Sequence, residues 1–246
     1  MKITVEGEGI HRQVDLYSRE GLELVSELWV KASCEHRIMY EPVWMGIPII
    51  QYPGDMVMMQ ELIWKVRPDV IVETGVAHGG SAVFYASILE LLGRGRVIAI
   101  DVEIRQYNKV AILGHPMSKR IRLIEGGSTD NDTVEQVRGL IGEGERTLFV
   151  FDSNHSYEHT LSEMERYSPM VSRDGYMVMM DGAQAFVGDI PSGKKEWRED
   201  NPLGAIREFL KRHPDWECDP YYNRLLVTSN PMGFLRRADR VPAGRS

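Results

Sequence analysis

The sequence has little of what marks a disulfide scaffold, a membrane protein or a nucleic-acid-binding protein. Its two cysteines, Cys34 and Cys218, are too few and too scattered for a disulfide framework or a zinc site. No apolar run approaches the roughly 20 residues that span a bilayer, and the opening MKITVEGEG lacks the apolar segment of a signal peptide. A formal net charge of −7 argues against a polyanion-binding surface. We therefore expect a cytoplasmic protein that binds neither nucleic acid nor membrane.

The remaining composition is that of an ordinary globular chain. With 246 residues, 43% of them hydrophobic and 26% charged, the chain is long enough for one α/β domain with an N-terminal extension. Residues 70–81, VIVETGVAHGGS, organise that domain. They predict a short buried strand, a glycine turn and the start of a helix, which is the first half of a nucleotide-binding α/β unit.

The spacing within this turn indicates the ligand. From Gly75 the chain lacks the second glycine of a dinucleotide fingerprint. It fits better the acidic-x-G-x-G-x-G pattern seen at the first motif of S-adenosylmethionine-dependent methyltransferases, with alanine replacing the middle glycine. An acid suits a ligand that carries an ammonium and a sulfonium. The residues expected to bind this cofactor are Glu73, Gly75, Ala77, Gly79, Gly80 and Ser81. The alternative is an ordinary strand–helix turn with a structural glycine.

Two further strands add cofactor candidates. Residues 96–100 predict a strand that ends in Asp101, which is placed to accept the ribose hydroxyls; a helix N-cap or a surface charge is the alternative for this acid. A third strand at residues 121–124 leads to Ser128, which we place on the adenine side.

The catalytic candidates follow the fourth and fifth strands. Asp152 follows a strand at residues 148–151, and Asp181 follows one at residues 176–180. Parallel strands present such residues at the ligand-binding edge, where two carboxylates can share a divalent cation. Asp152 is therefore expected both to contact the cofactor and to bind the metal. His155 is the best candidate for a general base; the alternative is that it caps the next helix. His159 is expected to support the site or lie on the surface.

The rest of the chain completes the domain division. We assign residues 1–55 to a helical extension, 56–237 to the methyltransferase-like domain and 238–246 to a fraying tail. Apolar spacing predicts a helix around Leu22, Val25 and Trp29, and further helices at residues 56–66, 134–141 and 203–211. Residues 41–55 read as an ordered loop and 183–202 as a loop over the site. Residues 225–228 predict a strand.

Several blocks in this order resemble one family. They are IVETGVAHGGSA, VIAIDVEIR, FDSNHSYEHTLSEMERYSPMVSRDGYMVMMD, NPLGAIREFL and LLVTSNPMGFLRR, and together they resemble the cephalosporin hydroxylase family. That family is similar to the macrolide-sugar and rhamnosyl O-methyltransferases. The resemblance implies a Rossmann-like, doubly wound methyltransferase sheet, magnesium at Asp152 and Asp181, and His155 as base. The chain departs from the metal-dependent members at Met180, where they have a second acid.

The sequence therefore predicts an S-adenosylmethionine-dependent O-methyltransferase. Its expected acceptor is a hydroxyl of a small polar metabolite, a sugar or a glycosylated natural product, with Mg as a further cofactor, and the resemblance implies a homo-oligomer. Two alternatives stay open: a non-haem iron hydroxylase and a non-catalytic S-adenosylmethionine-binding protein. The hydroxylase is disfavoured because the only His-x-acid tripeptide, at residues 213–215, is followed by no further histidine.

Overall fold

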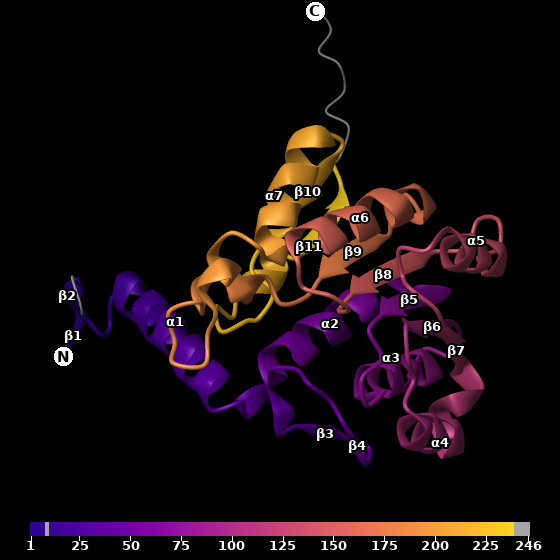
Figure 1. Cartoon of the computed structure of the whole chain (residues 1–246), viewed down its shortest axis with the longest axis horizontal. Coiled ribbons are helices and arrows are strands. Elements are labelled where there is room, and N and C mark those ends of the chain that lie inside the picture. The colour runs from indigo at the N-terminus through magenta and orange to yellow at the C-terminus, as the bar shows by residue number, and fades with distance from the viewer. Residues whose placement is uncertain (8–9, 239–246) are drawn as a thin grey trace, which may run out of the picture.

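The computed structural model describes residues 1–7 and 10–238. Within those residues, a seven-stranded sheet carries helices on both faces (Figure 1). Its strands are β5 (Val70–Thr74), β6 (Arg96–Asp101), β7 (Ile121–Glu125), β8 (Thr147–Phe151), β9 (Tyr176–Met179), β10 (Trp216–Cys218) and β11 (Phe234–Arg237). Their spatial order is β10-β11-β9-β8-β5-β6-β7, with the five strands from β9 to β7 parallel and β10 and β11 antiparallel to their neighbours.

The winding of the sheet locates the ligand-binding edge. The chain enters at β5, moves outward through β6 and β7, and returns to β8 on the other side of β5. Open α/β sheets bind ligands outside the carboxyl ends of their strands where the winding reverses, which here is between β5 and β8. The predicted doubly wound, Rossmann-like α/β fold is confirmed.

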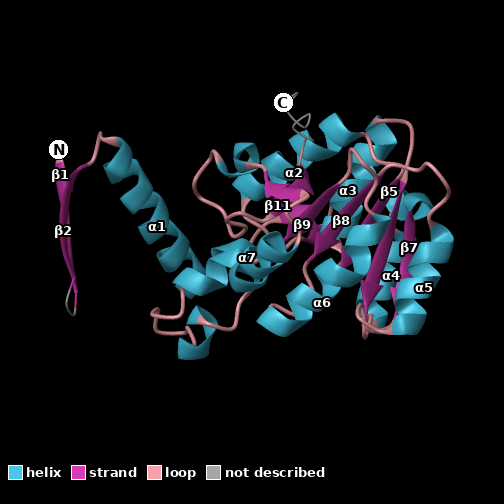
Figure 2. Ribbon diagram, turned by 90° about the horizontal axis from the view of Figure 1, so that it is seen from above, coloured by secondary structure: helices cyan, strands magenta, loops and turns pink. Residues whose placement is uncertain are grey.

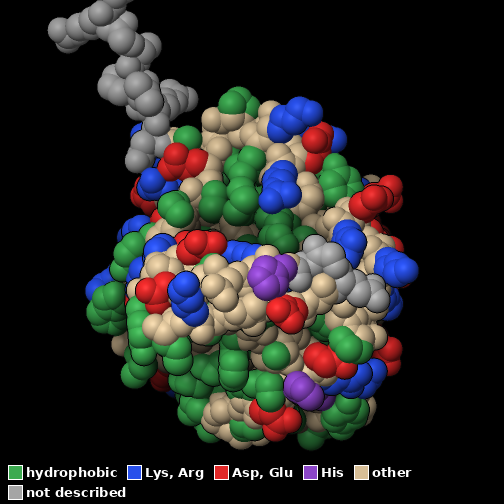
Figure 3. Space-filling view, turned by 90° about the vertical axis from the view of Figure 1, so that its left-hand side faces the viewer, with side chains coloured by type: hydrophobic (Ala, Val, Ile, Leu, Met, Phe, Trp, Pro, Cys, Tyr) green, Lys and Arg blue, Asp and Glu red, His purple; other side chains and the backbone are tan. Residues whose placement is uncertain are grey.

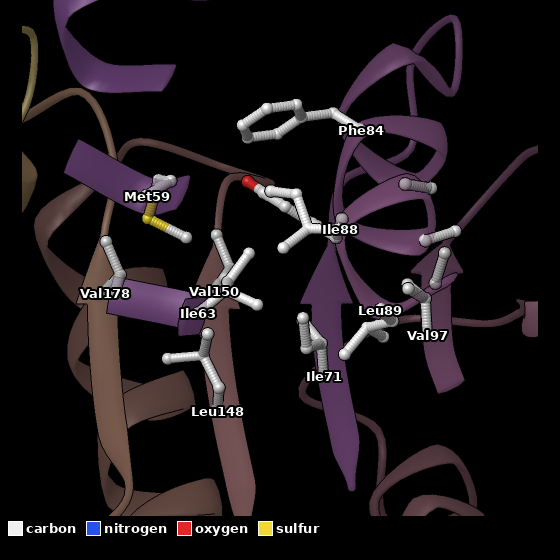
Figure 4. Close-up of a cluster of buried hydrophobic side chains, with 14 of the residues drawn as sticks. Met59, Ile63, Ile71, Phe84, Ile88, Leu89, Val97, Leu148, Val150 and Val178 are labelled. Carbon is white, nitrogen blue, oxygen red and sulfur yellow. The ribbon is translucent and has the colours of Figure 1, made fainter. Parts of the chain in front are cut away.

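Helices cover both faces of this sheet (Figure 2). The helices on these faces are α2 (Pro53–Val66), α3 (Gly80–Leu91), α4 (Gln106–Gly114), α5 (Asn131–Leu140), α6 (Tyr157–Tyr167) and α7 (Pro202–Arg212), whereas α1 (Arg19–Glu35) belongs to the N-terminal extension. One apolar layer joins the sheet to α2 and α3, and Figure 4 shows Met59 and Ile63 of α2 beside Val150 and Val178. The other layer joins it to α5, α6 and α7. Successive β5 residues alternate between the layers, as the pleat requires.

Most predicted elements lie within a few residues of the observed ones, but one strand is wrong. Residues 225–228 form no strand. Leu226 has φ +67°, a left-handed conformation that a β ladder does not accommodate, and Thr228 is hydrogen-bonded to Asp55 instead. The edge beside β9 is taken by β11, which lies a few residues later. Helix α4 and strand β10 were not predicted.

The N-terminal extension contains the predicted helix, but with the opposite face buried. In α1, Leu22, Val25 and Trp29 are 50%, 40% and 52% exposed, whereas Leu24 is 3% exposed. Ahead of α1, strands β1 (Lys2–Gly7) and β2 (Ile10–Asp15) form an antiparallel hairpin that the sequence did not predict. The hairpin and the start of α1 stand away from the body of the molecule (Figure 2).

The segment between α1 and α2, which was predicted as an ordered loop, contains a short strand pair and packs against the core. Strands β3 (Val43–Trp44) and β4 (Ile47–Pro48) form a short antiparallel pair against α3. Ile49 and Tyr52 are buried, and α2 begins at Pro53, three residues before the predicted helix. Apart from Ala238, the predicted tail lies outside the described residues. Among the described residues, no helix has both the length and the apolar character to cross a bilayer.

Candidate active site

The glycine turn after β5 is shaped by close backbone packing. Gly75 has φ +87°, and a Cβ there would lie 1.9 Å from the carbonyl oxygen of Asp152, so glycine lets the ends of β5 and β8 meet. Ala77, in place of the middle glycine, also has a positive φ of +45°. Its carbonyl accepts a 2.6 Å hydrogen bond from Asn108 Nδ2. The turn therefore keeps its left-handed conformation despite the alanine.

A cavity of about 410 Å³ opens over this turn at the carboxyl edge of the sheet. Its wall includes most of the predicted cofactor-binding residues, namely Gly75, Ala77, Gly80, Ser81, Asp101, Ser128 and Asp152. Two predicted residues are not on that wall. Gly79 packs against Ile112, whose Cδ1 would lie 2.3 Å from an added Cβ. Glu73 lies behind the wall.

Glu73 is fully buried at the end of β5. Its two carboxylate oxygens have no well-formed hydrogen bond among the described residues. Burial raises the pKa of Glu73 to about 8, and the nearby Ser81 side chain offsets only part of this effect. A buried acid without a partner is costly, so this side chain fits a ligand that brings a positive charge to the Ser81 side of the cavity.

Asp101, at the end of β6, holds the glycine turn in place. Its Oδ2 accepts hydrogen bonds from the backbone N–H of Val76 at 2.8 Å and of Ala77 at 3.4 Å. It does not cap α4, because the N-cap of that helix is Arg105. The N-cap interpretation of this acid is therefore wrong, and its carboxylate both shapes the turn and faces the cavity.

A partly buried polar cluster forms the wall beside Ser128. His159 Nε2 lies 3.1 Å from both Ser128 Oγ and Ser153 Oγ, and 3.4 Å from Glu163 Oε1. The hydrogen bond to Glu163 raises the pKa of His159 above its ordinary value. His159 thus joins the turn after β7 to the turn after β8, and its position inside the cavity was not recognised from sequence.

The three catalytic candidates meet at one end of the cavity. Each of Asp152, His155 and Asp181 offers a ligand atom within 4.8 Å of the other two, and His155 Nε2 lies 3.3 Å from Asp181 Oδ2. Burial, followed by the carboxylate of Asp181, raises the pKa of Asp152 well above its ordinary value. His155 does not cap α6, since Ser156 Oγ accepts the N–H of His159 in that role; the capping interpretation is wrong.

A second cavity, of about 380 Å³, adjoins the first. It lies between the end of α1 and the predicted loop at residues 183–202, which contributes Gln184, Val187 and Trp197 to its wall. The residues that line both cavities are Tyr40, Ile50, Gln51, His155 and Asp181. His155 and Asp181 therefore stand where the contents of the two cavities would meet.

Gln51 and Tyr40 were missed by sequence reasoning. Gln51 is 3% exposed, its Nε2 donates to Tyr85 Oη at 3.2 Å, and its Oε1 has no hydrogen-bond partner among the described residues. Tyr40 ends the short helical turn Ile38–Tyr40, and Gln51 comes from the proline-rich segment at residues 41–55 that follows, which has no motif of its own. Its only signal was three prolines in a segment too irregular for a helix.

Two other residues bear on the choice of chemistry. Met180 is 2% exposed and packs in the α2–α3 layer, so β9 supplies a single carboxylate to the site. His213 stacks on Phe209 and pairs with Glu165 at 2.9 Å, which gives it a structural role. The candidate metal group among the described residues therefore has one histidine and two carboxylates, unlike the two-histidine triad of an iron oxygenase.

Comparisons with known proteins identify relatives of this chain. The family profile described as rhamnosyl O-methyltransferase/CmcI matches residues 36–238. A rhamnosyl O-methyltransferase of Mycobacterium bovis (strain BCG / Pasteur 1173P2) is 28% identical over 226 residues, which is 87% of this chain and 86% of that protein. A rhamnosyl O-methyltransferase from Mycobacterium leprae (strain TN) is 31% identical over 140 residues, which is 56% of this chain and 59% of that protein.

Solved structures share the fold. A structure named as CmcI with Mg and SAM superposes with a TM-score of 0.59 at 21% identity, covering 81% of this chain and 78% of that one. MycE methyltransferase from the mycinamycin biosynthetic pathway, in complex with Mg, SAH and mycinamycin VI, superposes with a TM-score of 0.52 at 17% identity. The match covers 88% of this chain and 55% of that one.

Fold and site together define an α/β methyltransferase. The chain belongs to the rhamnosyl O-methyltransferase/CmcI family and is an O-methyltransferase by class. The family resemblance inferred from the sequence blocks is confirmed.

Proposed function

We propose that this enzyme transfers a methyl group from S-adenosylmethionine to a hydroxyl of a small polar acceptor, a sugar or a glycosylated natural product. The observation that carries the proposal is the meeting of two cavities at His155 and Asp181. The cavity over the glycine turn would hold the methyl donor, and the one under residues 183–202 would hold the acceptor. Each has a volume within the usual range for small-molecule sites.

The residues of the first cavity fit the methyl donor. Glu73, without a partner for its charge, would face the methionine ammonium by way of Ser81, and Asp101 would accept from the ribose hydroxyls. Ser128 and the His159 cluster would lie on the adenine side. S-adenosylmethionine supplies an electrophilic methyl group on its sulfonium. The protein's part is to hold that group at the boundary between the cavities.

Asp152 and Asp181 fit a magnesium ion. Mg²⁺ prefers oxygen ligands and is often bound through one or two carboxylates with water completing the shell. Burial and then the neighbouring acids raise the pKa of Asp152, and a bound cation would offset both effects by stabilising the ionised carboxylate. When bound, the ion lowers the pKa of an acceptor hydroxyl. The burial of Met180 in the core leaves Asp181 as the ligand supplied by the end of β9.

His155 would act as the general base. His155 Nε2 lies 3.3 Å from Asp181 Oδ2, and because a carboxylate only accepts hydrogen bonds, Nε2 would carry the imidazole proton in this arrangement. In neutral histidine this leaves Nδ1 with the free lone pair. Nδ1 would then take the proton of the acceptor hydroxyl as its oxygen attacks the methyl carbon.

The decisive test is binding and turnover with defined small molecules. Native mass spectrometry is expected to show one S-adenosylmethionine or S-adenosylhomocysteine retained per chain. Incubation with S-adenosylmethionine and a panel of glycosylated hydroxyl compounds is expected to add 14 mass units, one CH₂, to at least one of them. Binding without methylation of any glycoside would favour a non-catalytic cofactor-binding protein. Absence of both would overturn the proposal.

We propose in addition that the protein is a homo-oligomer. An isolated two-stranded hairpin is marginally stable by itself, and α1 exposes Leu22, Val25 and Trp29 along one side at spacings of three and four residues. Figure 3, which views the hairpin end, shows hydrophobic side chains gathered among charges of both signs. Light scattering is expected to give more than one chain per particle. Trp29→Glu is expected to shift the particle toward the monomer, and a wild-type monomer would contradict the proposal.

A further inference from the structure

The turn at residues 228–230 lies directly behind the metal-binding candidate Asp181. Asn230 is 0% exposed, and its Oδ1 accepts a 3.0 Å hydrogen bond from the backbone N–H of Asp181. Two residues further on, the N–H of Ala183 donates to the carbonyl oxygen of Ser229 at 2.9 Å. The turn therefore holds the chain on both sides of the peptide that follows Asp181.

Asp55, near the start of α2, holds this same turn from the other side. Its carboxylate is 1% exposed and accepts from Thr228 Oγ1 and from the backbone N–H of Ser229 at 2.8 Å. Thr228 Oγ1 in turn accepts the N–H of Asn230 at 2.9 Å. A continuous set of hydrogen bonds thus runs from Asp55 through Thr228 and Asn230 to Asp181.

Asp181 needs such support because of its backbone conformation. It has φ +56° and ψ +26°, the left-handed region that side chains other than glycine adopt at a cost. Such a conformation persists where the surroundings determine it. It turns the chain sharply at the end of β9, so that the Asp181 carboxylate lies 3.3 Å from His155 while Met180 packs into the core.

We propose that Asn230 and Asp55 are positioning residues, which set the direction of the Asp181 carboxylate and thereby the affinity of the site for a divalent cation. This inference rests on the proposed metal role of Asp152 and Asp181. It follows from the hydrogen bonds, the burial and the left-handed conformation together. The end of β9 supplies only one carboxylate to the site. If the Asp181 carboxylate is misdirected, no second acid from this strand end can bind the cation in its place.

The test measures cation binding itself. MgCl₂ is titrated calorimetrically into wild type and Asn230→Ala, and Asn223→Ala is the matched control. Asn223 donates to the carbonyl of Asn230 and accepts from the N–H of Met232, so it supports the same turn without touching Asp181. Loss of a residue that orients a metal ligand typically costs tenfold to a hundredfold in metal affinity. That loss is expected in Asn230→Ala, with Mg²⁺ affinity unchanged in Asn223→Ala.

A second pair of variants covers the case in which Asn230→Ala does not fold. Thr228→Val keeps the shape but removes the hydroxyl that joins Asp55 to Asn230, whereas Thr228→Ser keeps that hydroxyl. The valine variant is expected to bind Mg²⁺ several-fold more weakly than the serine variant. The kcat is expected to fall with the Mg²⁺ affinity, whereas the KM for S-adenosylmethionine stays constant.

The outcomes separate this inference from the proposed function. If wild type binds no Mg²⁺, the metal role itself fails and the positioning role fails with it. If wild type binds Mg²⁺ and the affinities of Asn230→Ala and Thr228→Val lie within twofold of it, the metal role stands and the positioning role is overturned. An equal loss of affinity in Asn223→Ala would also overturn it, because the effect would then be one of general stability.

Discussion

Glu73→Gln is expected to change the pH dependence of stability of the cofactor-free protein. In the folded state burial raises the pKa of Glu73 to about 8, against an ordinary value of 4.5 in the unfolded chain. A carboxyl group with a raised pKa contributes stability that is fully present below pH 4.5 and is lost as pH rises through 8, because the unfolded chain ionises first. Glutamine has a similar shape and does not titrate, so the variant lacks this loss.

The size of the effect follows from the pKa difference. One pKa unit corresponds to about 1.36 kcal/mol, so a change from 4.5 to about 8 is worth on the order of 5 kcal/mol once the carboxyl is ionised in both states. Structural relaxation around the charge makes this an upper figure. For a chain of this size each kcal/mol shifts the melting temperature by about 2–4 °C. The difference between variant and wild type is therefore expected to grow by roughly 10 °C between pH 5 and pH 9.

Thermal melts of wild type, Glu73→Gln and a control measure this difference. The control is Glu143→Gln, at an exposed turn residue, which is expected to follow wild type at every pH. S-adenosylmethionine would place an ammonium near Glu73 and favour the ionised acid. Its binding at pH 7 is therefore expected to release a proton, detected by calorimetry in buffers of different ionisation enthalpy. Parallel stability curves for wild type and Glu73→Gln across this pH range would refute the reasoning.

Three further variants or treatments test the proposed roles. Asp101→Ala is expected to weaken S-adenosylmethionine binding roughly tenfold to a hundredfold by calorimetry, because a charge-assisted hydrogen bond contributes about 1.5–3 kcal/mol; unchanged affinity in a folded variant would remove this assignment. Exhaustive chelation is expected to abolish methyl transfer and added Mg²⁺ to restore it, since Asp152 and Asp181 offer hard oxygen ligands; full turnover without divalent cations would give these acids another role. His155→Ala is expected to lower kcat by about 10²–10⁴ and to leave Mg²⁺ affinity intact, while His159→Ala costs much less. A loss of Mg²⁺ affinity in His155→Ala would make that histidine a ligand instead of the base.

The strands, the glycine turn and the acids at the strand ends could be predicted because they depend on neighbouring residues. A run of β-branched residues such as 70–72 predicts a buried strand wherever its neighbours lie, and a parallel sheet brings Asp101, Asp152 and Asp181 to one edge. The same reasoning misplaced a strand at residues 225–228. The apolar, β-branched residues there are partly buried in a turn, and composition alone does not distinguish such a turn from a buried strand.

Other features depended on segments that are distant in the chain. Periodicity identified α1 as a helix but not which side of it is buried, because that depends on what packs against it. Spacing marked Gly79 as a ligand contact, and only the tertiary structure shows that Ile112 packs against it. Thr228 and Asp55 are 173 positions apart, and their hydrogen bond has no local signal in either segment. The amino-acid sequence by itself determined which side chains stand at the strand ends, because backbone conformation is local. The tertiary structure decided the direction in which Asp181 points and the place where the two cavities meet, because these depend on contacts that form only when distant segments pack.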